Sequence, residues 1–209
     1  MATLLRIDSS PLGENSISRR LTGEFVEQWK QLHPEGEVIT RDLNTLDLRP
    51  IDAEWIAASY TPESARTPRQ KEVLSLSDKL VDELERADEY VLGVPMHNFF
   101  VPSTLKLWID QVARAGKTFA YTAAGPNGLL KGKKATFIIA SAGDYSPNTP
   151  RASMNFIEPY LRSVFGFIGV TDTAFVTAGG ASAVSSGKTD RETFLKPHVE
   201  SIRSVLKAA

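Results

Sequence analysis

The chain has 209 residues, a formal net charge of -1 and no cysteine. A chain of this length suits one domain, and we expect a single domain over residues 1–209. The absence of cysteine excludes disulfides, thiolate metal sites and cysteine nucleophiles. Because phosphate neutralisation needs clustered positive charge, the near-neutral balance argues against nucleic acid as a partner.

The apolar stretches of the chain fall short of the roughly 18 residues that span a bilayer. Few apolar residues precede Arg6 and Asp8, so we expect this apolar segment to be too short for the hydrophobic core of a signal peptide. We therefore expect a soluble, uncleaved protein with a cytoplasmic location and no membrane partner. The three histidines are scattered, and we expect no metal site.

The first part of the chain predicts alternating strands and helices. An apolar run at residues 4–7 indicates a strand, and apolar residues at three- and four-residue steps over 17–32 indicate a helix with one buried stripe. A short strand is expected at 37–43, followed by a polar stretch over 44–68 that we expect to cross the surface. Periodic apolar residues predict a helix at 70–86.

The second part continues the alternation. The predicted elements are a strand at 90–94, a helix around 105–112, a connector at 119–128, a strand at 135–140, a helix at 154–165, a strand at 173–177 and a final helix at 190–207. Near-continuous apolar strands between helices are typical of a parallel sheet covered on both faces. We predict an α/β protein with a flavodoxin-like, doubly wound, five-stranded parallel sheet of order 2-1-3-4-5.

Three loops with ligand-binding groups follow strands 1, 3 and 4, which are neighbours in this order, and ligands bind beyond their carboxyl ends. The first loop, residues 9–18, is rich in hydroxyl groups and leads into a helix. The first N–H groups of a helix are unpaired and carry positive charge, so this loop predicts a phosphate site. It lacks the glycine patterns of triphosphate and dinucleotide loops, which favours a single phosphomonoester. The alternative is an ordinary turn whose serine caps the helix.

The second and third loops, residues 95–100 and 141–144, offer groups that suit a planar heterocycle. Polar edges, flat or soft apolar surface and close backbone approach come from Met96, Asn98, Phe99, Phe100, Ser141 and Gly143. A flavin mononucleotide fits this set, because it has a terminal phosphate, a donor and acceptor edge and a broad aromatic body.

Seven short motifs are spread over nearly the whole chain. In order, they are Ser9-Ser10 with Ser16-x-Ser18, Arg41-Asp42-Leu43, Thr67-Pro68-Arg69-Gln70, Pro95-Met96-x-Asn98-Phe99, Val112-Ala113-Arg114-Ala115-Gly116-x-Thr118-Phe119-x-Tyr121-Thr122, Gly132-Lys133-Lys134-Ala135 and Gly166-Phe167-Ile168-Gly169. With these motifs the chain resembles the FMN-dependent NADH:quinone oxidoreductases that have azoreductase activity. The resemblance implies bound FMN, NADH or NADPH as donor, a quinone or azo acceptor, a ping-pong order and a homodimer with its sites at the interface.

The resemblance also implies site residues. The cofactor is expected to contact Ser10, Ser16, Ile17 and Ser18 at its phosphate, Met96, His97, Asn98 and Phe99 at its ring, and Ser141, Ala142, Gly143 and Asp144 at its pyrimidine edge. Substrate-binding residues are expected to be Phe119, Tyr121 and Phe156, the last in the partner's site. Two departures are visible, since the family often has tyrosine in place of His97 and an Arg-Gly-Gly continuation after Ser141. We expect FMN binding to survive both, because backbone groups make most contacts.

Several residues also have a plainer interpretation. His97 is a candidate proton donor, or a loop residue that only stacks or forms hydrogen bonds. Phe119 and Tyr121 cap the flavin or simply anchor the connector. Ordinary core positions are expected for Phe156, Phe165 and Phe167, and solvated positions for Arg19, Arg20, His33 and His198.

Two other functions remain as alternatives: a flavodoxin-type electron carrier and a mononucleotide-binding protein without turnover. Such carriers are usually strongly acidic, and the near-neutral charge counts against that interpretation. The segment 186–189 resembles the end of a triphosphate loop, but the glycine required five residues before Gly187 is Ser182. We therefore do not expect a nucleoside triphosphatase.

Overall fold

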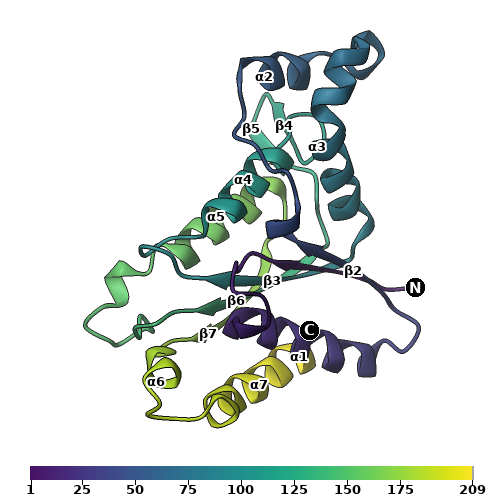
Figure 1. Ribbon diagram of the computed structural model, residues 1–209. Coiled ribbons are helices and arrows are strands. Elements are labelled where there is room, and N and C mark those ends of the chain that lie inside the picture. Colours follow the sequence, from purple (N-terminus) through teal and green to yellow (C-terminus); the bar gives the residue numbers. More distant parts are fainter. Residues whose placement is uncertain (209) are drawn as a thin grey trace.

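The computed structural model describes residues 1–208 and has a central sheet between two layers of helices (Figure 1). The sheet has the order β2-β1-β3-β6-β7, and all of its strand pairs are parallel. Its strands are β1 (Thr3–Asp8), β2 (Glu37–Asp42), β3 (Glu89–Pro95), β6 (Lys134–Ala140) and β7 (Asp172–Ala178). Counted within the sheet, this is the order 2-1-3-4-5, so the predicted flavodoxin-like architecture is confirmed.

The helices divide between the two faces of the sheet (Figure 1). On one face lie α1 (Ile17–Leu32) and α7 (Arg191–Lys207), and on the other lie α3 (Pro68–Arg86), α4 (Ser103–Val112) and α5 (Ile157–Ile168). Neighbouring strand residues point to opposite faces, so Leu4 packs below the sheet and Leu5 above it. This explains why the strands are apolar almost throughout.

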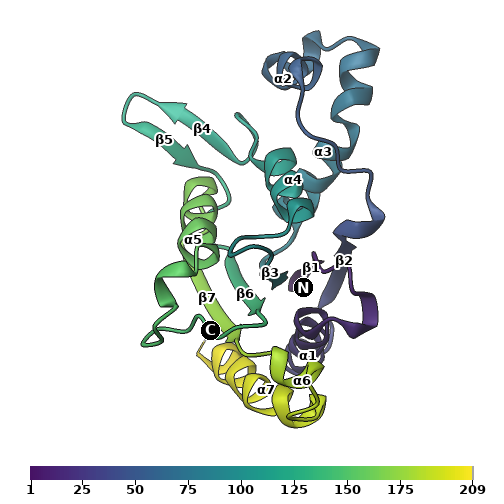
Figure 2. The ribbon, with the colours of Figure 1, turned by 60° about the vertical axis from the view of Figure 1, so that its left-hand side comes forward.

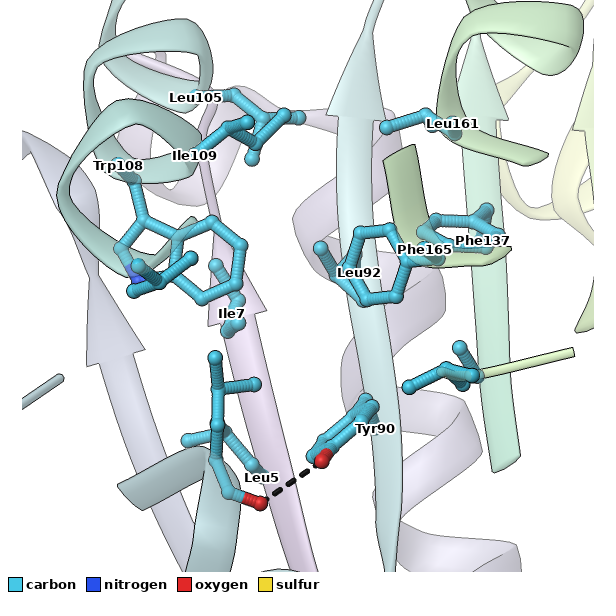
Figure 3. Packing of buried hydrophobic residues seen from close by; sticks show 14 of the residues in the cluster. Leu5, Ile7, Tyr90, Leu92, Leu105, Trp108, Ile109, Phe137, Leu161 and Phe165 are labelled. Carbon is cyan, nitrogen blue, oxygen red and sulfur yellow. Dashed lines mark hydrogen bonds between the residues drawn. The ribbon is translucent and has the colours of Figure 1, made fainter. Parts of the chain in front are cut away.

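The larger core lies between the sheet and α3, α4 and α5, and Figure 3 shows part of it. Trp108 from α4 and Phe165 from α5 pack over the strands without solvent exposure above 1%. The hydroxyl of Tyr90 donates a hydrogen bond to the backbone oxygen of Leu84 at 2.7 Å, which satisfies this polar group inside the core. Burial raises the pKa of Tyr90 far above its ordinary value, so it stays neutral.

Three segments differ from the prediction. The polar stretch after β2 contains a helix, α2 (Ala53–Tyr60), which Asp52 caps by accepting a hydrogen bond from the Trp55 backbone at 2.8 Å. The expected connector is an antiparallel hairpin of β4 (Phe119–Thr122) and β5 (Gly125–Gly128). Helix α5 begins three residues later than predicted, after a 3₁₀ turn at Ala152–Met154.

The hairpin projects from the body of the molecule beside α5 (Figure 2). Its base is fixed by close backbone approach, because a Cβ atom at Gly128 would overlap the backbone of Gly169. Gly169 ends α5 with a φ of 106°, a conformation that glycine adopts without strain. The backbone N–H of Leu130 donates to Ile168 at 2.9 Å, which ties the end of the hairpin to the same place.

Across residues 1–208, the helices are too short or too polar to cross a membrane.

Candidate active site

A pocket of about 410 Å³ opens at the carboxyl ends of β1, β3 and β6. This volume lies within the range of sites that hold cofactors. The pocket is lined by Ser10, Leu12, Asn15, Ser16, Ile17, Ser18, Pro95, Met96, His97, Ala140, Ser141, Ala142, Ala181, Ser182, Val184, Ser185 and Arg191. The three loops predicted from the sequence therefore meet in one place.

The first loop supplies hydroxyl and backbone donors. Ser10, Ser16 and Ser18 are no more than 2% exposed, and the Oγ atoms of Ser16 and Ser18 lie 3.1 Å apart. Ser16 Oγ also accepts a hydrogen bond from the Arg19 backbone at 3.1 Å, so Ser16 caps α1. The next N–H groups, of Ile17 and Ser18, have no acceptor within the helix, which makes this end of α1 suitable for an anion.

Residues behind the first loop hold it in position. Ser9 donates its hydroxyl to the Gly93 oxygen at 2.7 Å, which joins the residue after β1 to β3. Asp8 is 1% exposed and contacts Arg6 at 2.8 Å and the Thr22 hydroxyl at 2.7 Å. Burial raises the pKa of Asp8 although both neighbours favour its charged form.

Arg19 and Arg20 differ in their surroundings. Arg19 was expected to be solvated, but its side chain is only 17% exposed and forms an ion pair with Asp42 at 2.6 Å, so this prediction was wrong. The pairing partner lies on β2, which the local sequence around Arg19 does not reveal. Arg20 is 48% exposed and pairs with Glu24 one turn away, in keeping with an exposed helix position.

The second loop is a tight backbone turn. His97 and Phe100 exchange two backbone hydrogen bonds of 3.0 Å, and the two residues between them, Asn98 and Phe99, have φ values of 49° and 69°. Positive φ is unfavourable for a phenylalanine, so this turn stores strain beside the pocket. Met96 and the exposed His97 line the pocket, whereas Asn98 and Phe99 do not.

The third loop contributes Ser141 and Ala142 to the pocket. The Met96 backbone donates to Ala140 at 2.8 Å, which ties this loop to the second one. Gly143 and Asp144 do not line the pocket. The Asp144 carboxylate instead accepts hydrogen bonds from the backbone and hydroxyl of Ser146, at 2.9 and 2.5 Å, and these lower its pKa.

A fourth wall was not predicted. It consists of residues 181–185, which include the short helix α6 (Ser182–Ser185), and of Arg191 at the start of α7. Three backbone N–H groups fix this wall to the third loop: Gly180 donates to Gly143, Ala181 to Ser141 and Ser182 to Ala142, over 3.0 to 3.2 Å. The strand order could have predicted this wall, because the segment follows β7, which is the neighbour of β6 in the sheet.

The expected substrate residues lie outside the pocket of this chain. Phe119, Tyr121 and Phe167 form an aromatic cluster, with ring centroids 5.5 Å apart for Phe119 and Tyr121 and 4.5 Å apart for Phe119 and Phe167. Tyr121 is 71% exposed. Core positions were expected for three phenylalanines, and this is confirmed for Phe165 alone, since Phe156 is 54% and Phe167 37% exposed. Their apolar character alone did not distinguish core from surface.

The remaining histidines lie away from the pocket. His33 ends α1 with its ring centroid 4.6 Å from that of Trp29 and a side-chain exposure of 38%. His198 was expected to be solvated, but it lies on α7 with its ring near Phe194, and burial lowers its pKa. That expectation was wrong because the helix places the ring against an aromatic neighbour.

Fold and pocket together define a flavodoxin-like protein, and a family model described as "Flavodoxin-like fold" matches residues 2–205. An FMN-dependent NADH:quinone oxidoreductase of Acidobacterium capsulatum is 56% identical over 97% of this chain and 98% of its own length. The chain therefore belongs to the family of FMN-dependent NADH:quinone oxidoreductases and azoreductases.

Solved structures agree with this family. An azoreductase from Bacillus anthracis Sterne is 28% identical, with a TM-score of 0.86 and coverage of 98% of each chain. An FMN-dependent NADH-azoreductase from Bacillus anthracis Ames Ancestor, solved in complex with FMN, is 26% identical, with a TM-score of 0.85 and full coverage of both chains.

Proposed function

We propose that this chain is an FMN-dependent oxidoreductase that transfers electrons from NADH or NADPH to quinones and aromatic azo compounds. One observation carries the proposal: a single pocket joins a helix start with buried hydroxyl groups, a strained backbone turn and a serine loop. The names of the relatives support the same chemistry, and one similar structure was solved with FMN bound.

The pocket residues fit FMN in their chemistry. Ser10, Ser16, Ile17 and Ser18 are the proposed phosphate ligands, because they bring hydroxyl groups and the unpaired N–H groups of α1 to one end of the pocket. The ring is assigned to Met96, His97, Asn98 and Phe99, and the pyrimidine edge to Ser141, Ala142, Gly143 and Asp144. Asn98, Phe99, Gly143 and Asp144 do not line the pocket and enter the proposal as residues of the same two loops.

FMN held by these residues would supply the chemistry of hydride transfer from the nicotinamide donor and of two-electron reduction of the acceptor. The protein binds and orients the reactants, and its apolar pocket wall limits contact with water. Because one pocket serves both reactants, we propose a ping-pong order in which the donor leaves before the acceptor enters. His97 lies exposed at the edge of the pocket and is the proposed proton donor to the acceptor.

We also propose a homodimer. Phe119 is itself buried, but its neighbours Tyr121 and Phe167 leave aromatic surface uncovered on this chain, as does Phe156, and such surface commonly marks an interface. None of these residues lines this chain's own pocket, so a partner subunit is the proposed recipient of Phe119, Tyr121 and Phe156 as substrate-binding residues.

Two further proposals concern the number of domains and the cellular location. Residues 1–209 are proposed to form one domain, because both cores share a single sheet and the family model spans residues 2–205. A cytoplasmic location is proposed, because the nicotinamide donor is a metabolite of the cell interior.

The test is the oxidation of NADH by the purified protein with added FMN, first with a quinone and then with an azo dye. An enzyme of this kind consumes NADH rapidly in the absence of any protein partner, and initial rates at several acceptor concentrations give the parallel pattern of a ping-pong order. An electron carrier or a regulatory protein leaves NADH unconsumed, and that result would remove the proposal.

A further inference from the structure

Among the described residues 1–208, the only permanently charged cation that lines the pocket lies on the unpredicted wall. Arg191, the first residue of α7, lines the pocket beside Ser182 and Ser185. Every other lining residue is apolar, a hydroxyl, an amide or the imidazole of His97, and all of them belong to the described residues 1–208. The positive charge of Arg191 is therefore not duplicated anywhere on the pocket wall.

The side chain of Arg191 connects the start of α7 with the first loop. Its Nη2 donates a hydrogen bond to the backbone oxygen of Glu14 at 3.1 Å, across 177 positions of the chain. Glu14 belongs to the 3₁₀ turn Gly13–Asn15, which directly precedes Ser16 and the start of α1. The guanidinium thus contacts the turn that leads into the proposed phosphate site, and it lines the same pocket as Ser10, Ser16 and Ser18.

One donor of this guanidinium has no protein acceptor. Arg191 Nε is buried and forms no hydrogen bond within residues 1–208. A buried N–H without an acceptor is unfavourable, and native proteins rarely leave one so. Arg191 therefore has a hydrogen-bond donor that no protein group uses, as is also true of Arg19 Nε.

Nearby carboxylates do not satisfy the charge either. Over residues 1–208, no acidic side chain forms an ion pair with Arg191. The adjacent Asp190 is occupied by Thr193, whose backbone and hydroxyl it accepts at 2.9 and 2.6 Å. Glu14 and Glu192 are exposed. The positive charge of Arg191 is therefore not compensated by a protein carboxylate, and an anionic ligand in the pocket would compensate it.

We propose that Arg191 is a ligand of the terminal phosphate of the bound mononucleotide. The inference rests on the proposed function, since it takes FMN as the occupant of this pocket. The guanidinium would bring its charge and its unused Nε donor to a phosphate oxygen, while Nη2 keeps the turn before Ser16 in place. Guanidinium groups suit phosphate in both geometry and charge, and charge-assisted hydrogen bonds are the stronger ones.

The simplest alternative is a structural one, in which Arg191 only ties α7 to the turn at Glu14. Two substitutions separate these roles. Arg191→Gln removes the charge but leaves an amide N–H donor near the former position of Nε, whereas Arg191→Lys keeps the charge and removes the Nε donor. Both variants lose the Nη2 donor to the Glu14 oxygen. Arg203→Gln is the matched control, because Arg203 is an exposed residue of the same helix outside the pocket.

The experiment is a fluorescence titration of the flavin-free full chain with FMN and with riboflavin, which lacks the phosphate. Arg191→Gln is expected to weaken FMN binding by about 10- to 150-fold and to leave riboflavin binding unchanged. Arg191→Lys retains more of the preference for FMN than Arg191→Gln, and its FMN affinity stays sensitive to salt. Arg203→Gln behaves like the wild type.

The outcomes distinguish the two levels of the argument. If the wild type binds neither flavin, the proposed function fails. If the wild type prefers FMN and Arg191→Gln keeps the full preference, Arg191 is a structural tie and the inference is overturned. Should Arg191→Gln not fold, the Nε–H resonance of Arg191 in the wild type gives the answer: it shifts with FMN and not with riboflavin, and equal responses to both contradict the inference.

Discussion

The hydroxyl oxygens of Ser16 and Ser18 lie 3.1 Å apart at the buried start of α1. Ser16 also accepts a hydrogen bond from the backbone of Arg19, so it is a helix cap. Capping and phosphate binding are compatible in one residue, because a hydroxyl offers a donor and two acceptor positions. The geometry therefore allows the loop to be a helix cap, a phosphate site or both. A comparison of FMN with riboflavin, which lacks the phosphate, distinguishes these interpretations.

Replacing Ser16 and Ser18 together by alanine is expected to abolish much of the discrimination between FMN and riboflavin. Each hydrogen bond to the dianionic phosphate contributes about 1.5 to 3 kcal/mol, or about 10- to 150-fold in affinity, and riboflavin makes neither. Fluorescence titration measures both affinities. Thr67→Ala is the control, because it removes a helix cap from α3 far from the pocket. A double variant that keeps the full preference would identify the loop as a cap alone.

His97→Phe tests the proposed proton donor. Loss of a general acid typically slows the step it serves by about 10²-fold or more, so we expect the transfer of electrons to an azo compound to slow by that factor. The reaction with NADH needs no such proton and should change little. Stopped-flow absorbance follows the two half-reactions separately, with His33→Phe as a control outside the pocket. An unchanged second half-reaction assigns His97 to packing.

Tyr121→Glu tests the proposed dimer. Tyr121 is 71% exposed, so the fold of one chain should tolerate the change, but a carboxylate is costly in an apolar interface. Light scattering is expected to give a dimer for the wild type and a monomer with little activity for the variant. Tyr60 is also 71% exposed, and Tyr60→Glu should remain a fully active dimer. A wild-type monomer that is active with quinone would refute both the dimer and the shared site.

Asp8 predicts a pH dependence of stability beneath the phosphate loop. Burial raises its pKa in the folded protein above the ordinary value of 3.8. The folded state then binds the proton more tightly, so the contribution of Asp8 to stability is fully present below pH 3.8 and is lost as pH rises through the raised pKa. Urea unfolding of the wild type and Asp8→Asn at a series of pH values measures this.

We expect the difference in the free energy of unfolding, Asp8→Asn minus wild type, to increase across this pH range. Thr22→Val serves as a companion variant, because it removes the hydroxyl that donates to Asp8 at 2.7 Å and should raise the pKa of Asp8 further. A difference that stays constant with pH would contradict the assigned titration of Asp8.

The strands and three walls of the pocket could be predicted because each depends on a local pattern. A strand such as β6 is apolar at nearly every position, since both of its faces are covered. The meeting of the first three loops follows from the strand order, which places β1, β3 and β6 side by side. The first step needs only local patterns, and the second follows from the alternation of strands and helices rather than from any particular side-chain contact.

The missed features depend on such contacts. The strand β5 reads Gly-Pro-Asn-Gly, which has no strand propensity, and it forms because β4 pairs with it and Gly128 packs against Gly169. An arginine at the start of a helix is usually solvated, and the place of Arg191 at the pocket depends on the approach of α7 to Glu14, 177 positions away in the sequence. Phe156 and Phe167 are exposed because no other segment of the described chain packs fully over them, which the local sequence does not reveal.

The most direct test of the central claim is one anaerobic absorbance measurement on the purified protein loaded with FMN. Addition of NADH alone should bleach the visible flavin absorbance, and subsequent addition of a quinone should restore it without any other protein. That result is expected if the pocket at the carboxyl ends of β1, β3 and β6 holds a flavin that serves both reactants in turn. A protein that takes up no FMN, or whose flavin absorbance is unchanged by NADH, would contradict the account.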